Sequence, residues 1–318
     1  MRDANPVTDS GNRSFGWSHG NPVRVGTHHP RDRTRLAGMT TVALLGTGIM
    51  GAGMGRSLAR AGLDVTVWNR SADKARALGL PVADAAADAV RGKDVVVTML
   101  FDADSVAAVM RDALPAMGED AVWVQTSTVG LEGTAVLAGL AAEHGVAYVD
   151  APVLGTRQPA ENGQLTVLAA GPEDVRERIA PVLDAVSAKV VWVGEEPGGG
   201  HRLKLVANAW VLSLVAATAQ SVALAEGLGL DPRRFLELIE GGPLDSGYAQ
   251  LKGKAMLSGD FTPAFALSGA TKDAGLIRAA AADAGVATDL VAAMEKLFAA
   301  AGDQDDDMAA VIRATRPA

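Results

Sequence analysis

An apolar run that leads into a glycine-spaced turn is the feature that most restricts what this chain can fold into. Val42–Leu45 precedes glycines at positions 46, 48 and 51, and a second apolar run, Val65–Trp68, follows a helical pattern. In a dinucleotide-binding βαβ unit, the first glycine permits a tight turn, the second lets backbone approach the pyrophosphate, and the third lets helix and strand pack closely. The helix N-terminus then offers unpaired N–H groups to the phosphates. The residues predicted to bind a cofactor in this turn are Gly46, Thr47, Gly48, Ile49, Met50 and Gly51.

The residues that end the second run indicate which dinucleotide is preferred. A site for NAD usually places an acidic residue there, which accepts hydrogen bonds from the ribose 2′-hydroxyl. This chain instead has Asn69, Arg70 and Ser71, with Lys74 one helical turn later. A guanidinium and a hydroxyl suit a 2′-phosphate, which an acidic group would repel. We therefore predict that NADP(H) is preferred, with NAD(H) as the alternative.

Short apolar runs alternate with helical patterns from residue 41 to about residue 194. This alternation is typical of a parallel sheet covered by helices on both faces. Such sheets bind ligands at the carboxyl ends of their strands, so Met99, Leu100 and Thr128 are further predicted cofactor contacts. Residues 39–201 are assigned to an NADP-binding Rossmann domain. The predicted strands are Val42–Leu45, Val65–Trp68, Val95–Met99, Val122–Thr126, Ala147–Asp150, Thr166–Ala170 and Val190–Val193.

From residue 202 the pattern is helical throughout, so residues 202–318 are assigned to an all-helical substrate and dimerisation domain. Leu205–Ala225 has no charged residue and is long enough to cross a membrane. Polar residues interrupt it and no basic excess flanks it, so we interpret it as a buried helix. The predicted fold class is α/β, a Rossmann-type doubly wound sheet followed by an all-α C-terminal domain joined by a long helix. Further helices are predicted over 232–241, 248–258, 269–284, 288–301 and 306–315.

Composition excludes several classes of function. A net charge of −8 and an aromatic content of 4% argue against binding to nucleic acid or to an anionic membrane. The absence of cysteine excludes disulfides, thiolate catalysis and zinc–sulfur sites. After residue 38 the histidines are His144 and His201, too few for a histidine metal cluster, and we predict no metal. The aspartates at 303 and 305–307 lack the spacing of a calcium loop and predict a solvated helix start.

Residues 1–38 are rich in Arg, Gly, Pro, Asn and His and show no apolar periodicity. They lack the apolar core of a secretory signal. We interpret them as a disordered tail or a mis-called start, with Met39 as the natural initiator, and we expect a cytoplasmic protein.

Lys204 is the candidate catalytic group, because it begins the long apolar helix. Lys204 and Asn208 are four residues apart and share one helix face. A lysine in an apolar helix is costly unless it reaches a pocket, although it can also snorkel at a helix end. A bound nicotinamide needs a polar partner that moves a proton as hydride moves. His201 and Arg202 are predicted to be surface residues of the helix start.

Four separate motifs between about Thr41 and Thr315 resemble the β-hydroxyacid dehydrogenase family, which is related to 6-phosphogluconate dehydrogenase. The resemblance implies that Lys204 is the catalytic lysine and that Asn208 acts beside it. It also implies that Lys272 and Asp273 lie near the nicotinamide and the substrate. The four motifs are Gly46–Gly51 with Trp68–Arg70, Asp150–Thr156, Gly198–Asn208 and Ala270–Asp273.

Within that family, the segments 159–165, 252–256 and 263–265 are similar to those of glyoxylate/succinic semialdehyde reductases, which implies that Phe265 and Asp273 line the substrate site. The substrate loop departs from the family pattern Pro-Val-Ser-Gly. Leu154 stands at the position of the serine that helps to hold a substrate carboxylate, and Thr156 replaces the usual glycine or serine. The loss of one polar contact can change discrimination by orders of magnitude. We therefore expect Leu154, Gly155 and Thr156 to contact a substrate that is more apolar near its reacting carbon.

The resemblance implies an NAD(P)-dependent oxidoreductase acting on CH–OH or C=O groups. We predict NADPH-dependent reduction of a small aldehyde or keto acid, or oxidation of a 3-hydroxy acid, with Lys204 as proton donor or acceptor. One alternative is an imine reductase-like enzyme, although those relatives usually have Asp or Tyr at the position of Lys204. Another alternative is a non-catalytic NADPH-binding protein. The predicted partners are a small-molecule substrate and further copies of the chain in a homodimer or homotetramer.

Overall fold

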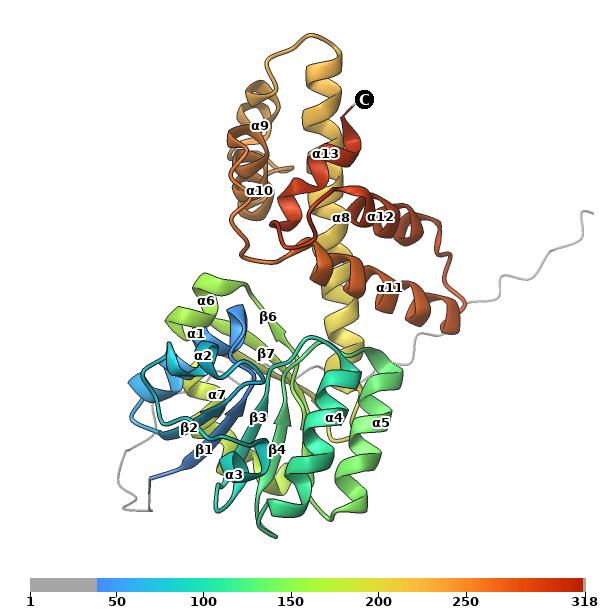
Figure 1. The fold of residues 1–318 in the computed structure, drawn as a ribbon. Coiled ribbons are helices and arrows are strands. Elements are labelled where there is room, and N and C mark those ends of the chain that lie inside the picture. The colour runs from blue at the N-terminus through green and yellow to red at the C-terminus, as the bar shows by residue number, and fades with distance from the viewer. Residues whose placement is uncertain (1–38, 317–318) are drawn as a thin grey trace, which may run out of the picture. The chain divides into compact units, whose positions relative to one another are not determined.

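The computed structural model describes residues 39–316, and residues 41–194 of it form a sheet with helices on both faces (Figure 1). The prediction for residues 1–38 lies outside the described residues. The strands are β1 (Thr41–Leu45), β2 (Asp64–Trp68), β3 (Val95–Thr98), β4 (Val122–Gln125), β5 (Ala147–Asp150), β6 (Val153–Leu154), β7 (Leu165–Ala170) and β8 (Ser187–Gly194). Their order is β2-β1-β3-β4-β5-β7-β6, with β8 paired to β7. The two-residue strand β6 was not predicted.

Strands β1 to β5 are parallel, and their carboxyl ends meet at one edge of the sheet. Leu45 at the end of β1 lies opposite Trp68 of β2 and Thr98 of β3. Gln125 of β4 lies opposite both Thr98 and Asp150. Strands β3 and β4 are buried along their whole length, which explains why they are continuous apolar runs without alternation. This register places the loops after β1, β3 and β4 side by side.

The prediction of a wholly parallel sheet was wrong at β7. Strand β7 is antiparallel to both β5 and β6, while β8 is parallel to β7. A parallel connection needs a crossover that returns along the sheet, usually a helix. The six-residue helix between β6 and β7, α6 (Arg157–Asn162), packs instead against the first helix of the chain, so the chain re-enters the sheet from the same edge.

Helices cover the two faces of the sheet and create two apolar cores. One core joins the sheet to α1 (Ile49–Arg60), α6 and α7 (Arg176–Val186). The other joins it to α3 (Ala86–Val90), α4 (Ala103–Ala113) and α5 (Gly130–Glu143). A short helix, α2 (Ala72–Arg76), follows β2. The two faces together form the doubly wound layer that the alternating pattern predicted.

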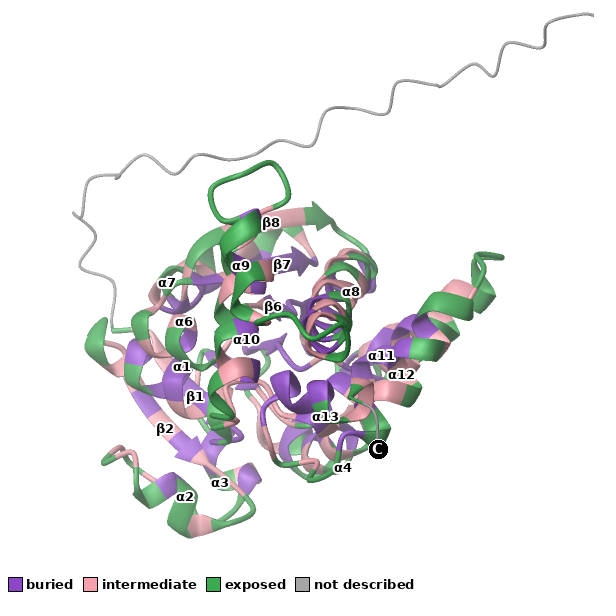
Figure 2. Cartoon of the chain, turned by 90° about the horizontal axis from the view of Figure 1, so that it is seen from above, coloured by how far each residue is buried: buried purple, intermediate pink, exposed green. Residues whose placement is uncertain are grey.

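The rest of the described chain is helical. The long helix α8 (Gly199–Gly227) is followed by α9 (Arg233–Ile239), α10 (Gly247–Ser258), α11 (Leu267–Asp283), α12 (Asp289–Ala300), the 3₁₀ turn η3 (Met308–Val311) and α13 (Ile312–Thr315). Leu212, Val215 and Phe298 are fully buried in the core that these helices share. Figure 2 shows the buried residues concentrated in the strands and on one side of the helices.

Helix α8 is buried on one side and exposed on the other. By length and composition it is the one helix in the described residues that could cross a membrane. Its most apolar stretch of 18 residues has a mean hydropathy of 1.5, and 44% of that stretch is buried. Leu205, Leu212 and Val215 enter the helical core, whereas Val206 and Trp210 are each 68% exposed. The predicted burial therefore holds for only one face of this helix.

In the acidic cluster near the C-terminus, Asp303 and Asp305 are exposed and Asp307 starts η3, but Asp307 is buried, so the prediction of a solvated helix start was wrong for that residue. The Lys252 Nζ donates to Asp307 Oδ1 at 2.6 Å, and both side chains are buried. Asp307 also accepts the backbone N–H of Ala309 and so caps η3. Asp306 pairs with Arg313 at 2.6 Å. The prediction failed because the buried cation comes from α10, about fifty residues earlier in the chain.

Candidate functional site

The glycine turn after β1 has the close contacts that a dinucleotide site requires. Gly46 has a φ of +108°, and a Cβ there would lie 2.2 Å from the carbonyl oxygen of Met99. A Cβ on Gly51 would lie 2.0 Å from the carbonyl oxygen of Gly46, so α1 can approach the turn only without a side chain there. A Cβ on Gly48 would meet nothing within 4 Å. Gly48 thus faces open space where a pyrophosphate can approach backbone.

Asn69 fastens this turn to the end of β2. The Thr47 N–H donates to Asn69 Oδ1 at 3.1 Å, and Asn69 Nδ2 donates to the carbonyl oxygen of Ser71 at 3.0 Å. Arg70, Ser71 and Lys74 are exposed just beyond it. The basic groups predicted to recognise a 2′-phosphate are therefore free to face solvent beside the turn.

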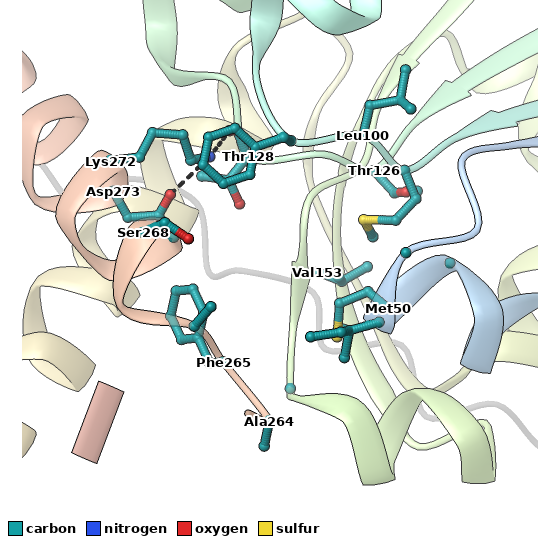
Figure 3. A pocket seen from close by; sticks show the side chains of 18 of the residues that line it. Met50, Leu100, Thr126, Thr128, Val153, Ala264, Phe265, Ser268, Lys272 and Asp273 are labelled. Carbon is teal, nitrogen blue, oxygen red and sulfur yellow. Dashed lines mark hydrogen bonds and ion pairs between the residues drawn. The ribbon is translucent and has the colours of Figure 1, made fainter. Parts of the chain in front are cut away.

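A cavity of about 370 Å³ joins the glycine turn to the helical part of the chain (Figure 3). Its floor comes from the loops after β1, β3 and β4, and its opposite wall comes from Lys204 of α8 and from residues around the start of α11. Of the predicted site residues, those lining the cavity are Gly48, Ile49, Met50, Gly51, Asn69, Met99, Leu100, Thr128, Gly155, Lys204, Phe265, Lys272 and Asp273.

Several predicted residues lie outside this lining. Gly46 and Thr47 lie beneath the turn and shape it, while Arg70, Ser71 and Lys74 lie beyond it. Asn208 contacts the cavity only through Asp273. Leu154 and Thr156 do not line the cavity, although Val153 and Gly155 on either side of Leu154 do. Side chains alternate along an extended strand, so residue 153 of β6 faces the cavity and residue 154 faces away.

Lys204 is nearly enclosed, with 7% of its surface exposed, yet it lines the cavity. Burial lowers its pKa to about 8, because a charged ammonium loses hydration there. The Asp273 carboxylate opposes this shift, and the Lys272 ammonium adds to it. An amine with such a pKa exists in both protonation states near neutral pH, which suits proton transfer.

Asp273 is held on two sides. Asn208 Nδ2 donates to Asp273 Oδ2 at 2.6 Å, so the two residues that face Lys204 are joined to each other. Lys272 Nζ lies 3.0 Å from Asp273 Oδ1, at ion-pair distance but without hydrogen-bond geometry. The same ammonium donates to the carbonyl oxygen of Thr128 at 2.5 Å and thereby connects α11 to the loop after β4 (Figure 3). These bonds fix the carboxylate beside the cavity.

The prediction that His201 lies at the surface was wrong. Asp150 at the end of β5 accepts the N–H groups of Gly198 and His201, and so caps α8. The His201 ring is fully buried; its Nδ1 donates to Asp150 Oδ1 at 2.5 Å and its Nε2 accepts the N–H of Val129 at 3.0 Å. A Cβ on Gly200 would lie 2.3 Å from the carbonyl oxygen of Leu168, so the first turn of α8 lies directly against the sheet. These contacts place Lys204, one turn later.

The sequence did not identify part of the cavity wall. None of these residues is charged. Val153 and Ala264 lie within the segments 150–156 and 263–265 that resemble the family, and Thr126 ends a predicted strand, but nothing in their residue types marked them as site residues. Ser268 is a polar side chain of the first turn of α11, four residues before Lys272, and this helical spacing was the available signal. The lining residues that were missed are Phe101, Thr126, Val153, Ala264, Ala266, Ser268 and Gly269.

The residues present fit a nicotinamide dinucleotide. The first turn of α1 has no acidic residue to repel a phosphate. Within residues 39–316, the buried Thr47 Oγ1 has no hydrogen-bond partner, which leaves a polar atom beneath the turn for a ligand. The cavity continues from Gly48 to Lys204, so one bound molecule can reach from the glycine turn to the amine. In the same described part of the chain, no group of His, Cys, Asp and Glu residues could hold a metal ion.

Comparison with known proteins shows that each half of the chain matches a family model. Residues 41–194 match the family model described as the NAD binding domain of 6-phosphogluconate dehydrogenase. Residues 198–315 match the model described as the NAD-binding domain of NADP-dependent 3-hydroxyisobutyrate dehydrogenase. The chain is 33% identical over 298 residues to glyoxylate/succinic semialdehyde reductase 2, chloroplastic, of Arabidopsis thaliana. The aligned region covers 91% of this chain and 83% of that protein.

Two solved structures have the same arrangement over almost their whole length. The 3-hydroxyisobutyrate dehydrogenase of Mycobacterium tuberculosis, solved with L-serine, is 30% identical, with a TM-score of 0.78 over 88% of this chain and 100% of that chain. The 3-hydroxyisobutyrate dehydrogenase of Salmonella typhimurium is 27% identical, with a TM-score of 0.79 over 86% of this chain and 99% of that chain.

Proposed function

Because the chain belongs to the β-hydroxyacid dehydrogenase family, whose members are NAD(P)-dependent oxidoreductases of CH–OH and C=O groups, we propose that it reduces a small aldehyde or keto acid with NADPH. The reverse reaction oxidises the corresponding hydroxy acid. The observation that carries this proposal is the amine of Lys204, which is buried, has a lowered pKa and lines the cavity that begins at the glycine turn. A solvated surface lysine would have none of these properties.

The chain's own residues supply binding and proton transfer. Bound NADPH supplies a hydride equivalent to the carbonyl carbon. The ammonium of Lys204 donates a proton to the carbonyl oxygen as negative charge develops on it. Asp273 stabilises this ammonium. Asn208 acts by holding the Asp273 carboxylate, and not by binding the substrate oxygen directly. Phe265 and Val153 keep water from the reacting atoms.

A carbonyl panel followed by NADPH oxidation tests this proposal. The panel contains glyoxylate, succinic semialdehyde and a ketone without a carboxylate, each assayed with NADPH and with NADH. Turnover of at least one carbonyl supports the proposal. A cyclic imine in the same panel separates it from imine reduction: turnover of the imine alone would contradict carbonyl reduction. NADPH binding without turnover of any compound would favour a non-catalytic nucleotide-binding protein.

The preference for NADPH depends on Arg70. An Arg70→Asp substitution should raise the Kd for NADPH by about 10- to 100-fold, because a charged hydrogen bond contributes about 1.5–3 kcal/mol. The loss should shrink at high salt, since Arg70 is exposed. Isothermal titration with NADPH and NADH measures both affinities. Arg91→Asp is the control, because Arg91 is an exposed arginine that follows α3, pairs with Asp88 of that helix and does not line the cavity. An unchanged ratio of NADPH to NADH affinity in Arg70→Asp would contradict the proposed recognition.

We propose that a second copy of the chain covers the exposed face of α8, giving a homodimer or a homotetramer built from such dimers. Val206, Trp210 and Leu224 are each more than half exposed along this helix, and together they form an uncharged stripe. A twofold axis across such a stripe would bury the same residues from both copies. Light scattering tests this: a single mass of 32.5 kDa, that of one chain, would contradict it. A cytoplasmic location is likewise part of the proposal, and cell fractionation tests it.

A further inference from the structure

Asp307 is a buried carboxylate that accepts four hydrogen bonds from three separate segments of the helical part of the chain. Its Oδ1 accepts Lys252 Nζ at 2.6 Å and the N–H of Ala309 at 2.9 Å. Its Oδ2 accepts the N–H of Ala264 at 3.0 Å and the N–H of Phe265 at 3.2 Å. Only 3% of the residue is exposed. One carboxylate therefore ties α10 and η3 to the segment that precedes α11.

The segment held by Oδ2 is part of the cavity wall. Ala264, Phe265 and Ala266 all line the cavity, and Figure 3 shows Ala264 and Phe265 on the wall opposite Met50 and Val153. Backbone bonds on either side follow the same path. The Asp307 N–H donates to the carbonyl oxygen of Phe261, and the Met308 N–H donates to the carbonyl oxygen of Phe265. Residues 307 and 308 thus hold the segment 261–265 by hydrogen bonds on the side away from the cavity.

Gly269 fixes the direction of the Phe265 ring. A Cβ on Gly269 would lie 2.6 Å from the Phe265 ring atom Cε2, so the ring occupies the space that a side chain on α11 would fill. With its backbone held by Asp307 and its ring seated on Gly269, Phe265 has little freedom to move. Its position then sets the width of the cavity between Phe265 and the opposite wall at Met50 and Val153 (Figure 3).

Lys252 is the cation that pairs with Asp307 in a buried place. Its side chain is 4% exposed, and its ammonium lies 5.4 Å from the centre of the Tyr248 ring. A buried carboxylate without a cation is strongly unfavourable, and two buried ions seldom add stability beyond what an apolar pair would give. Stability alone therefore does not account for the pair, whereas the two backbone N–H groups held by Asp307 Oδ2 give it a structural role.

We propose that Asp307, with Lys252, is a positioning residue that sets the Phe265 wall of the substrate cavity and thereby determines substrate selectivity. This inference rests on the proposed function for its kinetic test. Neither residue touches the cavity, so both act through the backbone of Ala264 and Phe265.

Two double variants isolate this role. In Asp307→Asn/Lys252→Met, an amide oxygen still accepts from Ala264 and Phe265, while the ion pair and the cap on Ala309 are lost. In Asp307→Leu/Lys252→Met, the ion pair and cap are lost in the same way, and the acceptor is lost as well. A role in stability alone predicts similar behaviour of the two variants. A positioning role predicts that they differ.

Hydrogen exchange, measured by mass spectrometry on peptides covering 261–268, is the readout that needs no activity. We expect the leucine variant to exchange the Ala264 and Phe265 amides at least tenfold faster than the asparagine variant. If leucine prevents folding, Asp307→Ser/Lys252→Met replaces it, because serine can still cap Ala309 but is too short to reach the Ala264 segment. Equal exchange in the acceptor-free and asparagine variants would overturn the proposal.

Selectivity is the second readout. The ratio of kcat/KM for succinic semialdehyde to that for glyoxylate does not depend on the fraction of folded enzyme. We expect it to change at least fivefold in the acceptor-free variant and by less than twofold in the asparagine variant, with the Kd for NADPH unchanged in both. Glu226→Gln is the control, because Glu226 pairs with Arg316 far from the cavity. A lowered Tm with an unchanged ratio would overturn the proposal. If the native chain reduces no carbonyl, the proposed function fails, and exchange alone decides this inference.

Discussion

Replacing Lys204 with methionine is expected to lower kcat for carbonyl reduction by about 10³-fold while leaving the Kd for NADPH within a factor of two. General acid catalysis by a placed side chain contributes about 10²- to 10⁴-fold, and methionine retains the length of the side chain but has no proton to give. Stopped-flow oxidation of NADPH measures kcat, and fluorescence titration measures cofactor binding. Lys296→Met on α12 is the control, since this lysine is exposed and outside the cavity. Retained turnover in Lys204→Met would remove the amine from the mechanism.

The same amine sets an expected pH dependence. Because the pKa of Lys204 is lowered to about 8, carbonyl reduction should decline as pH rises through about 8, where the proton donor is lost. Alcohol oxidation, which needs the neutral amine, should rise over the same range. Initial rates in both directions from pH 6 to 10 measure this. A reductive rate that stays level to pH 10 would show that another group donates the proton.

Stability should change with pH in a related way. The folded state has a lower lysine pKa than the unfolded state, so between about pH 8 and 10.5 the unfolded chain binds more protons. The free energy of unfolding therefore rises with pH across that window, and burial of the ammonium destabilises the fold below it. Lys204→Met should consequently raise Tm at pH 7 and remove this rise. The most active protonation state for reduction is thus also the less stable one.

A Gly51→Ala substitution is expected to weaken NADPH binding by about 10²-fold and to lower Tm. The added Cβ would lie 2.0 Å from the carbonyl oxygen of Gly46, so α1 must move away from the turn that holds the pyrophosphate. Forcing extra atoms into a packed site costs about 1–3 kcal/mol. Isothermal titration and thermal unfolding measure the two effects. Wild-type affinity and Tm in this variant would contradict the assigned geometry.

Two further glycines provide controls for this experiment. A Cβ on Gly48 meets nothing within 4 Å, so Gly48→Ala should keep the wild-type Tm and lose affinity only because the methyl group occupies the path of the cofactor. Gly139 lies in α5 with equally open surroundings and outside the cavity, so Gly139→Ala should change neither affinity nor catalysis. Comparing Gly51→Ala, Gly48→Ala and Gly139→Ala therefore separates an effect on the folding of the turn from an effect on cofactor binding to the turn.

Local patterns predicted most of the fold. Each predicted apolar run became a strand, and the runs of β3 and β4 are continuous because both faces of these strands are buried. Gly46 and Gly51 act within the turn where they stand in sequence, and Asn69, at the end of β2, bonds to that turn. Strand β7 was predicted, but its antiparallel direction was missed, because the direction depends on where the intervening helix packs. Propensity and periodicity contain no information about that choice.

The site was predictable where chemistry is visible in residue type and unpredictable where it depends on distant partners. Lys204 is a charged residue in an apolar helix, and such an exception is visible in a sequence. Asp273 was expected from the resemblance of Ala270–Asp273 to a family motif. The buried state of His201 depends on Asp150 and Val129, and that of Asp307 on Lys252, each some fifty residues or more away. Val153 and Leu154 were confused because strand β6 was not anticipated, and its phase decides which side chain faces the cavity.

The position of the Lys204 amine depends on the glycine at the start of α8. Because a Cβ on Gly200 would lie 2.3 Å from the carbonyl oxygen of Leu168 and 2.9 Å from that of Asp150, any larger residue there would push the start of the helix away from the sheet. This displacement would lift the amine one turn later and leave the nucleotide turn, which belongs to other strands, intact. A single substitution at position 200 is therefore expected to remove turnover while leaving NADPH binding in place.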